Sequence, residues 1–239
     1  AITDINDLYV SGTSDIGANI TTTGTQEYNN NVTLSGAART LTTSGATVTF
    51  TGTVNGAQDL TVDTTSGDSS ATTVQFASTV GDTTKVGAII ITGNLNLDGN
   101  IIKTSDSSAG ATSINVSGTS DLGADVTTTG TQTYTGAVTL SADNTLTTTS
   151  NGNVSFGSTT NGAQTLSITT NGTGDVTFTD DVGESAGLNG LTISTNDFNA
   201  VDLKVGGTIS ITNTGTSSDI TGVIANDTDA AVLTKAGTG

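Results

Sequence analysis

The chain has 239 residues, of which 22 are acidic and 5 are basic, and its formal net charge is −17. This balance argues against nucleic acid and anionic membranes as partners, because phosphate-rich partners need clustered Lys and Arg. The sequence has no His or Cys, which excludes conventional Ser-His-Asp and Cys-His catalysis, disulfide bonds and thiolate metal sites. It also has no apolar run approaching the roughly 18 residues of a membrane-spanning helix, so we expect no membrane insertion.

The chain contains one long stretch twice. Residues 10–24 read VSGTSDIGANITTTG and residues 116–130 read VSGTSDLGADVTTTG, so the offset is 116 − 10 = 106 residues. An internal duplication, at about 10–115 and 116–221, therefore makes up most of the chain. We expect residues 1–239 to form one continuous unit.

Short apolar clusters that alternate with Thr, Ser, Asn or another polar residue follow one another along the chain. This period of two predicts strands with one apolar side, and the β-branched Thr favours the same structure. In chain order the clusters lie at residues 32–34, 48–50, 60–62, 74–76, 95–97, 138–140, 154–156, 166–168, 176–178, 191–193, 201–203 and 209–211. Helical periodicity is absent over any useful window, so the sequence predicts an all-β chain.

The spacing of the clusters favours a parallel β-helix, also called a β-solenoid. Phe156 and Phe178, for example, are 22 residues apart, and coils of roughly 20 residues are typical of β-solenoids. Asn-Gly pairs such as Asn55-Gly56 supply corners between the strands. We expect Val, Ile, Leu and Phe to stack inside the coils, and Thr, Ser and Asn to form ladders outside.

Two tandem immunoglobulin-like sandwiches are the alternative, because about 100 residues is also the usual size of such a domain. The two domains would cover 1–106 and 107–239, with Lys103–Gly110 (KTSDSSAG) as the linker. The sequence has no Trp, few other aromatic residues and no Pro-rich boundary near this segment, which favours the solenoid. In a solenoid the same segment would be a loop that protrudes from one corner.

The segment TYTGAVTLSADNTLTTTSNGNVSFGSTTNGAQTLSI (133–168) and its counterpart in the first copy resemble the repeats of giant bacterial surface proteins. These are the filamentous-haemagglutinin-like adhesins and autotransporter passengers. Residues 232–239 (VLTKAGTG) resemble the start of the passenger-associated repeat of autotransporters. The resemblance covers nearly the whole chain and is compositional as much as positional. It implies a secreted, extracellular, right-handed β-helical stalk at the bacterial cell surface.

Carboxylate pairs are the remaining candidates for catalysis. The neighbouring pairs are Asp121 with Asp125, Asp180 with Asp181, and Asp227 with Asp229. Neighbouring acids in turns are usually solvated, and β-helical polysaccharide-cleaving enzymes also need basic and aromatic residues, which are scarce here. We therefore expect no enzyme activity.

Calcium is the metal that acidic turns would bind, because hard cations take carboxylate and carbonyl oxygens. Residues 94–99 (NLNLDG) mimic the opening of a calcium loop, but the acidic residue needed at the twelfth position is missing. The candidate ligands are therefore Asp180, Asp181 and Glu184, which would bind calcium diffusely. We expect no other cofactor.

The Thr triplets at 21–23, 127–129 and 147–149 raise the hypothesis of ice binding, which uses flat Thr ladders on β-solenoids. One Thr-x-Thr face would then recur on every coil. The triplets do not recur in that way, so we expect them to form external polar ladders instead.

Taken together, the patterns predict a structural and adhesive segment of a secreted surface protein, a stalk or fibre without catalysis. A solenoid coil is stable only when a neighbour covers it, and no cap is evident at Ala1 or Gly239. We therefore expect contacts with other copies of the chain or with neighbouring repeats of a longer one. Surface glycans or host proteins are further expected partners. The alternatives are tandem sandwich-type adhesin domains with calcium at their junctions and, less favoured, a polysaccharide-active enzyme.

Overall fold

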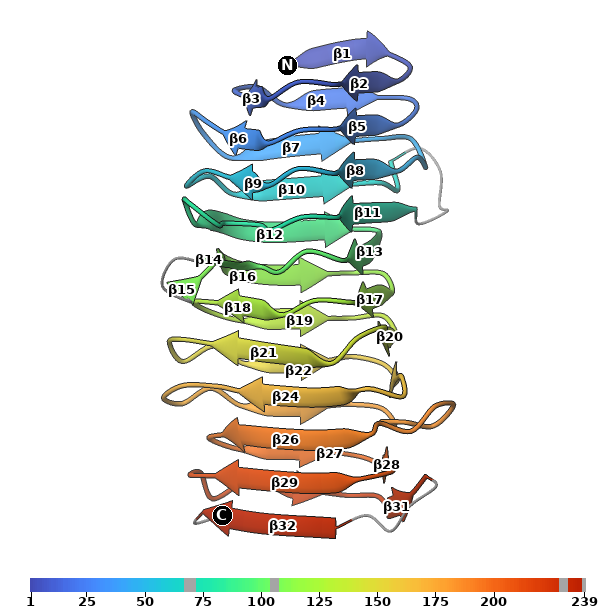
Figure 1. Cartoon of the computed structure of the whole chain (residues 1–239), viewed down its shortest axis with the longest axis vertical. Helices are drawn as coiled ribbons and strands as arrows, with labels where there is room; N and C mark the ends of the chain where they lie inside the picture. Colours follow the sequence, from blue (N-terminus) through green and yellow to red (C-terminus); the bar gives the residue numbers. More distant parts are fainter. Residues whose placement is uncertain (67–71, 104–107, 228–231, 238–239) are drawn as a thin grey trace.

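The computed structural model describes residues 1–66, 72–103, 108–227 and 232–237, and the regular elements among them are all β-strands. The strands wind into one column, with the N-terminus at one end and the C-terminus at the other (Figure 1). Successive strands lie in three stacks, which we call face 1, face 2 and face 3, and each coil visits them in that order.

Each face is a continuous stack of strands from successive coils. Face 1 contains β1 (Ile2–Ile5), β4 (Ile20–Thr22), β7 (Arg39–Thr42), β10 (Leu60–Asp63), β12 (Val86–Thr92), β16 (Ala111–Val116), β19 (Gln132–Tyr134), β22 (Val154–Phe156), β25 (Val176–Phe178), β27 (Phe198–Ala200) and β30 (Asp219–Ile220). Face 2 contains β2 (Leu8–Val10), β5 (Gln26–Tyr28), β8 (Val48–Phe50), β11 (Thr73–Phe76), β13 (Asn94–Leu97), β17 (Ser120–Leu122), β20 (Val138–Leu140), β23 (Thr160–Asn161), β28 (Leu203–Val205) and β31 (Ile224–Asn226). Face 3 contains β3 (Ser14–Ile16), β6 (Val32–Leu34), β9 (Val54–Asn55), β18 (Val126–Thr128), β21 (Asn144–Thr148), β24 (Thr165–Thr169), β26 (Gly190–Thr195), β29 (Thr208–Asn213) and β32 (Val232–Gly237). Single bridging residues complete the stacks where a coil has no named strand, namely Val80 and Ile101 on face 3 and Val182 on face 2.

The strand pairs within the three faces are parallel and join one coil to the next. On face 1, Gln132 pairs with Val154 and Val154 pairs with Val176, each 22 residues further along the chain. The predicted parallel β-helix is thus confirmed, with coils of about 22 residues. An immunoglobulin-like sandwich would need antiparallel sheets. The only antiparallel pair in the described part of the chain joins β14 (Ile102–Lys103) to β15 (Ser108–Ala109).

The apolar positions of the strands meet in one shared core. In β22, Val154 and Phe156 are fully buried, whereas Ser155 between them is partly exposed. A single cluster of buried apolar side chains extends from Ile16 to Ile211. Burial of one such side chain contributes roughly 1.5–3 kcal/mol relative to exposure. The column is therefore stabilised along its whole length by one continuous apolar core.

The two sequence copies occupy different faces of the column. Tyr28 lies in β5 on face 2, whereas its counterpart in the second copy, Tyr134, lies in β19 on face 1. A strand that lies five complete coils further along the chain is on the same face again. Tyr134 lies one strand position before that point, so the 106-residue unit is one strand position short of five complete coils. The second copy is consequently rotated about the column axis relative to the first.

The segment Lys103–Gly110, the linker of the sandwich alternative, is only partly described by the structure. β14 and β15 pair only with each other among the described residues, and residues 104–107 between them lie outside the described part. On face 3 the stack continues across this position in the chain, because Val80 bridges to Ile101 and Ile101 bridges to Val126. The described residues on its two sides therefore belong to one continuous stack.

Candidate functional surfaces

Aromatic rings form two ladders inside the column. On face 2 the ring centroids of Tyr28 and Phe50 are 5.2 Å apart, those of Phe50 and Phe76 are 5.1 Å apart, and the planes are nearly parallel. The second ladder, on face 1, consists of Tyr134, Phe156, Phe178 and Phe198. Such pairs contribute about 0.5–1.5 kcal/mol each beyond the burial of their surface. These rings therefore serve packing and are hidden from any external ligand.

A buried polar network accompanies each ladder. Gln26 Nε2 donates to the backbone carbonyl of Thr42 at 3.0 Å and to Thr22 Oγ1 at 3.3 Å. The Tyr28 hydroxyl donates to Gln26 Oε1 at 3.0 Å. Gln132 is the centre of the same network in the second copy. A buried amide is costly unless it is hydrogen-bonded, so the network fixes this corner. Its signal in the sequence is the repeated GTQEY and GTQTY, which our predictions did not use.

Asp and Asn side chains at the corners accept hydrogen bonds from backbone N–H groups of the next coil. In one ladder, Asn153 Oδ1 accepts from the N–H of Asp175 at 2.9 Å. Asp175 Oδ1 accepts from the N–H of Asp197 at 3.0 Å, and Asp197 Oδ1 accepts from the N–H of Ser217 at 2.8 Å. The same contact to a following coil is made by Asp7, Asn19, Asn31, Asp59, Asn94, Asn100, Asp125, Asp143, Asn151, Asn161 and Asp202. Hydrogen bonds to charged acceptors are stronger than neutral ones, so these acids join coil to coil.

The electrostatic consequence is clearest at Asp143. The backbone N–H of Thr165 donates to Asp143 Oδ1 at 2.8 Å. This bond, together with a side-chain hydrogen bond from Thr165, lowers the pKa of the Asp143 carboxyl below its ordinary value. The folded state thus favours the charged carboxylate, and this contribution is lost as the pH falls through the lowered pKa.

The predicted calcium ligands do not gather into a metal-binding group. No cluster of three or more Asp, Glu, His or Cys suited to a metal ion occurs among the residues that the structure describes. Asp180 Oδ1 accepts the N–H of Asp181 at 2.9 Å. Asp181 and Glu184 line a hollow that also contains Lys204, whose Nζ lies 2.8 Å from Asp227 Oδ1. This ammonium group weakens cation binding there. Calcium binding at the three predicted residues stays a prediction.

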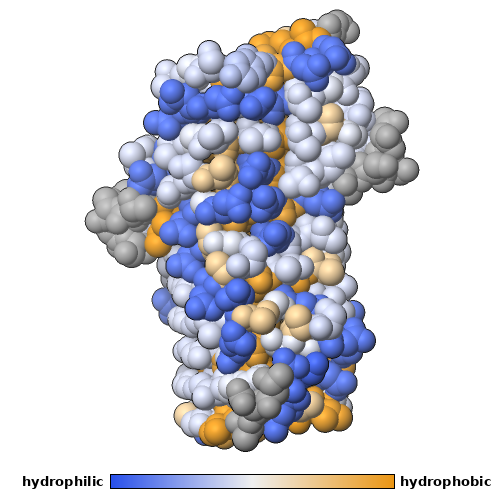
Figure 2. Space-filling model, turned by 45° about the vertical axis from the view of Figure 1, so that its right-hand side comes forward, coloured by the Kyte–Doolittle hydropathy of each residue, from blue (hydrophilic) through white to orange (hydrophobic). Residues whose placement is uncertain are grey.

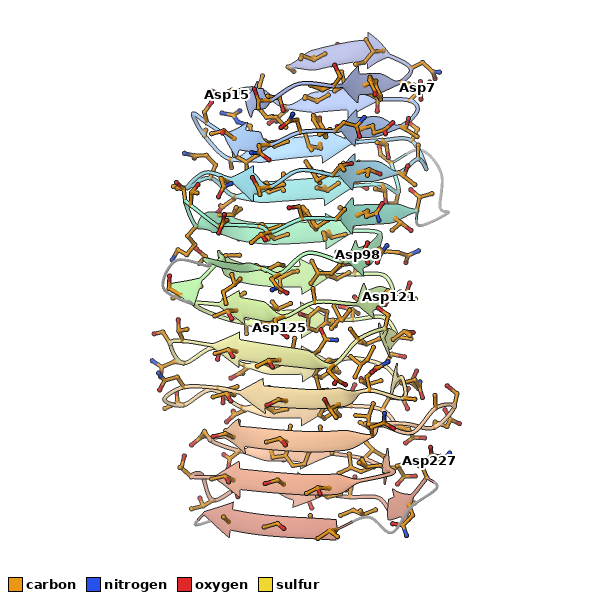
Figure 3. The ribbon with its side chains drawn as sticks, in the orientation of Figure 1. Asp7, Asp15, Asp98, Asp121, Asp125 and Asp227 are labelled. Carbon is orange, nitrogen blue, oxygen red and sulfur yellow. The ribbon has the colours of Figure 1, made fainter. Side chains whose placement is uncertain are left out.

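The structure places three of the carboxylates considered for catalysis, Asp121, Asp125 and Asp227. Asp121 lies on the outer side of β17, and Asp125 at the following corner accepts the N–H of Thr145 at 2.7 Å (Figure 3). Asp227 forms the ion pair described above, and Asp229 lies outside the described residues. The structure thus assigns a coil-joining contact to Asp125 and an ion pair to Asp227.

The strands at the two ends of the column expose apolar side chains. In the described part of the chain, β1 pairs only with β4 and β32 only with β29. Ile2 is 46% exposed, and Val232 and Leu233 are 57% and 50% exposed. Apolar surface is visible at both ends of the column (Figure 2). Beside β1, a hollow of about 330 Å³ opens between Ile2, Leu8 and Ile16. An edge strand of this kind can pair with a further strand.

A search for membrane-spanning helices in the described part finds none that is long and apolar enough. In comparisons with known proteins, no family model, no curated protein and no solved structure matches the chain.

Proposed function

We propose that the chain is a structural and adhesive segment of a secreted bacterial cell-surface protein, in which the solenoid acts as a stiff stalk or fibre. The observation that carries the proposal is the unbroken stack of coils, with one apolar core and parallel strand pairing from end to end. The resemblance to filamentous-haemagglutinin-like adhesins supports the extracellular location.

The dimensions of the column suit a spacer. Ten successive strand pairs separate β1 from β30. At about 4.8 Å per pair the column rises roughly 48 Å over this distance. Because each coil contacts only its neighbours, further repeats lengthen such a column without changing its width.

The end strands are the proposed sites of longitudinal contact. The exposed edge and apolar side chains of β1 and β32 can be covered by neighbouring coils of a longer chain or by another copy of this one. Adhesion would take place on the outer faces, with glycans or proteins of other surfaces as partners. The strongly negative charge keeps such an exposed surface soluble.

Location can be tested with antibodies raised against the purified chain and applied to intact cells of the source organism. We expect labelling without permeabilisation, and loss of the label after treatment of intact cells with an external protease. An antibody against a cytoplasmic protein serves as the control and should label only permeabilised cells. Labelling of this chain only after permeabilisation would contradict the proposal.

The absence of catalysis is part of the same proposal. Incubation of the chain with a panel of acidic and neutral polysaccharides, with and without calcium, should give no new reducing ends or unsaturated products. Reproducible turnover of any member of the panel would overturn this part and assign the carboxylates a catalytic role.

A further inference from the structure

The last strands of face 3 carry two columns of Thr and Ser that face outward. The first column consists of Thr145, Ser167, Thr192, Ser210 and Thr234. The second column consists of Thr147, Thr169, Ser194, Thr212 and Ala236. We call the Thr and Ser residues of both columns the hydroxyl array. It extends over β21, β24, β26, β29 and β32, which lie side by side in the lower half of Figure 1.

The orientation of the array follows from the residues between the columns. Ile193 is buried, and its neighbours Thr192 and Ser194 are exposed on the other side of β26. Ile211 is likewise buried between Ser210, which is partly exposed, and Thr212, which is exposed. The array is therefore an outer surface, and the stacked apolar core of the column lies beneath it.

The fold leaves these hydroxyl groups unused. No hydrogen bond joins a side chain of the array to another described group. The Thr residues at the adjacent corner behave differently, because Thr148 Oγ1 donates to the carbonyl of Gly152 at 2.7 Å and Thr170 Oγ1 to that of Gly174 at 2.6 Å. The corner hydroxyls thus serve the backbone, whereas those of the array are free to bond to whatever lies outside.

The array also contains no charged residue, although the chain carries a net charge of −17. Neither column contains an acidic or basic residue over its five strands. The outward positions on the other faces are mixed: face 2 presents Glu27 and Asp121, and face 1 presents Ile90 and Asp219. Face 1 also has a single column of outward hydroxyls, Thr133, Ser155 and Thr177, but it ends at Asn199. Two adjacent neutral columns over five strands occur on face 3.

We propose that the hydroxyl array binds the surface of crystalline water, so that this part of the column adheres to ice. Neighbouring strands are about 4.8 Å apart and alternate residues along a strand about 6.6 Å apart. The array thus sets hydroxyls, each a donor and an acceptor, on a rectangular lattice whose two spacings are close to those between oxygen atoms in hexagonal ice. Charged groups, which an ice lattice does not accommodate, are absent from it.

The composition of the array disfavours a protein partner or a second copy. Protein interfaces are enriched in Tyr, Trp, Met and Arg, and their binding energy comes mainly from such anchors. The two columns contain only Thr, Ser and one Ala. Repetition of weak, identical contacts on a rigid lattice suits a periodic ligand better than a protein surface.

In the sequence, the Thr triplets do not recur on every coil, and for that reason the sequence alone does not favour ice binding. The structure shows that the array is built mainly from other residues, which pair at intervals of 22, 25, 18 and 24 residues along the first column. Thr127, in the preceding coil, pairs with Thr147 but is only 7% exposed. The array therefore begins at β21, and its uneven sequence spacing hides it from any search for a fixed repeat.

The test is partition of the purified chain into a slowly growing shell of polycrystalline ice, with serum albumin as an inert reference protein. We expect the chain to enter the ice and the albumin to be excluded. The double variant T192K/T212K places two charged side chains in the array and should lose incorporation. The matched variant T133K/T177K changes outward residues of face 1 and should retain it.

Both variants change exposed or partly exposed Thr residues, and circular dichroism and the melting temperature should show that they remain folded. Exclusion of the unmodified chain from ice, to the same extent as albumin, would overturn the proposal whatever the variants do. Equal incorporation of both variants would overturn the assignment to face 3. A dimer in sedimentation experiments that T192K/T212K alone dissociates would assign the array to a second copy and also overturn it.

Discussion

Single carboxylates in this chain act as connectors between coils. Asp175 Oδ1 accepts hydrogen bonds from the backbone N–H of Asp197 at 3.0 Å and from Asn196 Nδ2 at 2.8 Å, both in the next coil. Seven acidic residues act in this way at the corners of the column, where each accepts a backbone N–H of the following coil: Asp7, Asp59, Asp125, Asp143, Asp175, Asp197 and Asp202. This arrangement explains how a chain with so many acidic residues packs its coils closely.

The first prediction concerns the connector role of Asp175. Asp175→Ala leaves the N–H of Asp197 without its acceptor and should lower the free energy of unfolding by about 1 kcal/mol. Asp175→Asn keeps an acceptor oxygen and removes one negative charge near Asp197, so its effect should stay within roughly 0.5 kcal/mol. Urea denaturation followed by circular dichroism measures both. Equal losses in the two variants would show that charge, and not the hydrogen bond, is what matters.

The second prediction concerns the two buried tyrosines. Burial raises the pKa of Tyr28 and Tyr134, because the ionised phenolate is poorly solvated inside the column. The folded state keeps these protons while the unfolded state releases them, so stability is lost as the pH rises above the ordinary tyrosine pKa of about 10. In a Tyr9→Phe variant, tyrosinate absorbance should appear only together with unfolding. A tyrosinate signal that precedes the loss of circular dichroism would contradict the buried positions.

At the scale of the strand, alternation of apolar and polar residues predicted the all-β class and the strands with the clearest apolar pattern, but not the many shorter strands between them. The pattern of Val154, Ser155 and Phe156 gave the correct strand and the correct inner side. The strand predicted at 201–203 was wrong, because β28 begins at Leu203. Asp202 is a corner residue whose Oδ1 accepts the N–H of Val223 at 2.6 Å. Three alternating residues cannot show whether the acid between them belongs to a strand or to a corner.

The third prediction tests this alternation within one strand. Val154→Asp places a carboxylate in the core between Gln132 and Val176, where an unpaired buried charge costs several kcal/mol. The variant should therefore unfold at much lower urea concentration or fail to fold. Ser155→Asp introduces the same group on the outer side of β22 and should change stability by roughly 0.5 kcal/mol or less. Comparable losses in both variants would place Ser155 inside and contradict the register.

At the scale of the whole molecule, the sequence revealed the duplication but not its rotation about the axis. The rotation depends on how many strand positions the first copy contains. Two of these positions, Val80 and Ile101, are single bridging residues without a strand pattern of their own. The hydroxyl array was missed for a related reason, because its residues are brought into register by corners of different lengths. Alternation can be recognised from residues that are adjacent in the chain. Which distant residues stack on one another depends on the length of every corner between them.

The central claim is that the chain forms one stiff column, and the absence of native cysteine allows it to be tested with two unique spin labels. Glu27→Cys in β5 and Ala225→Cys in β31 place labels on face 2, nine strand pairings apart. At about 4.8 Å per pairing, the backbone positions are roughly 43 Å apart. Double electron–electron resonance should give one narrow distance distribution near this value, widened only by the label linkers. A broad or two-peaked distribution, or a much shorter mean distance, would show separate mobile parts and contradict the single column.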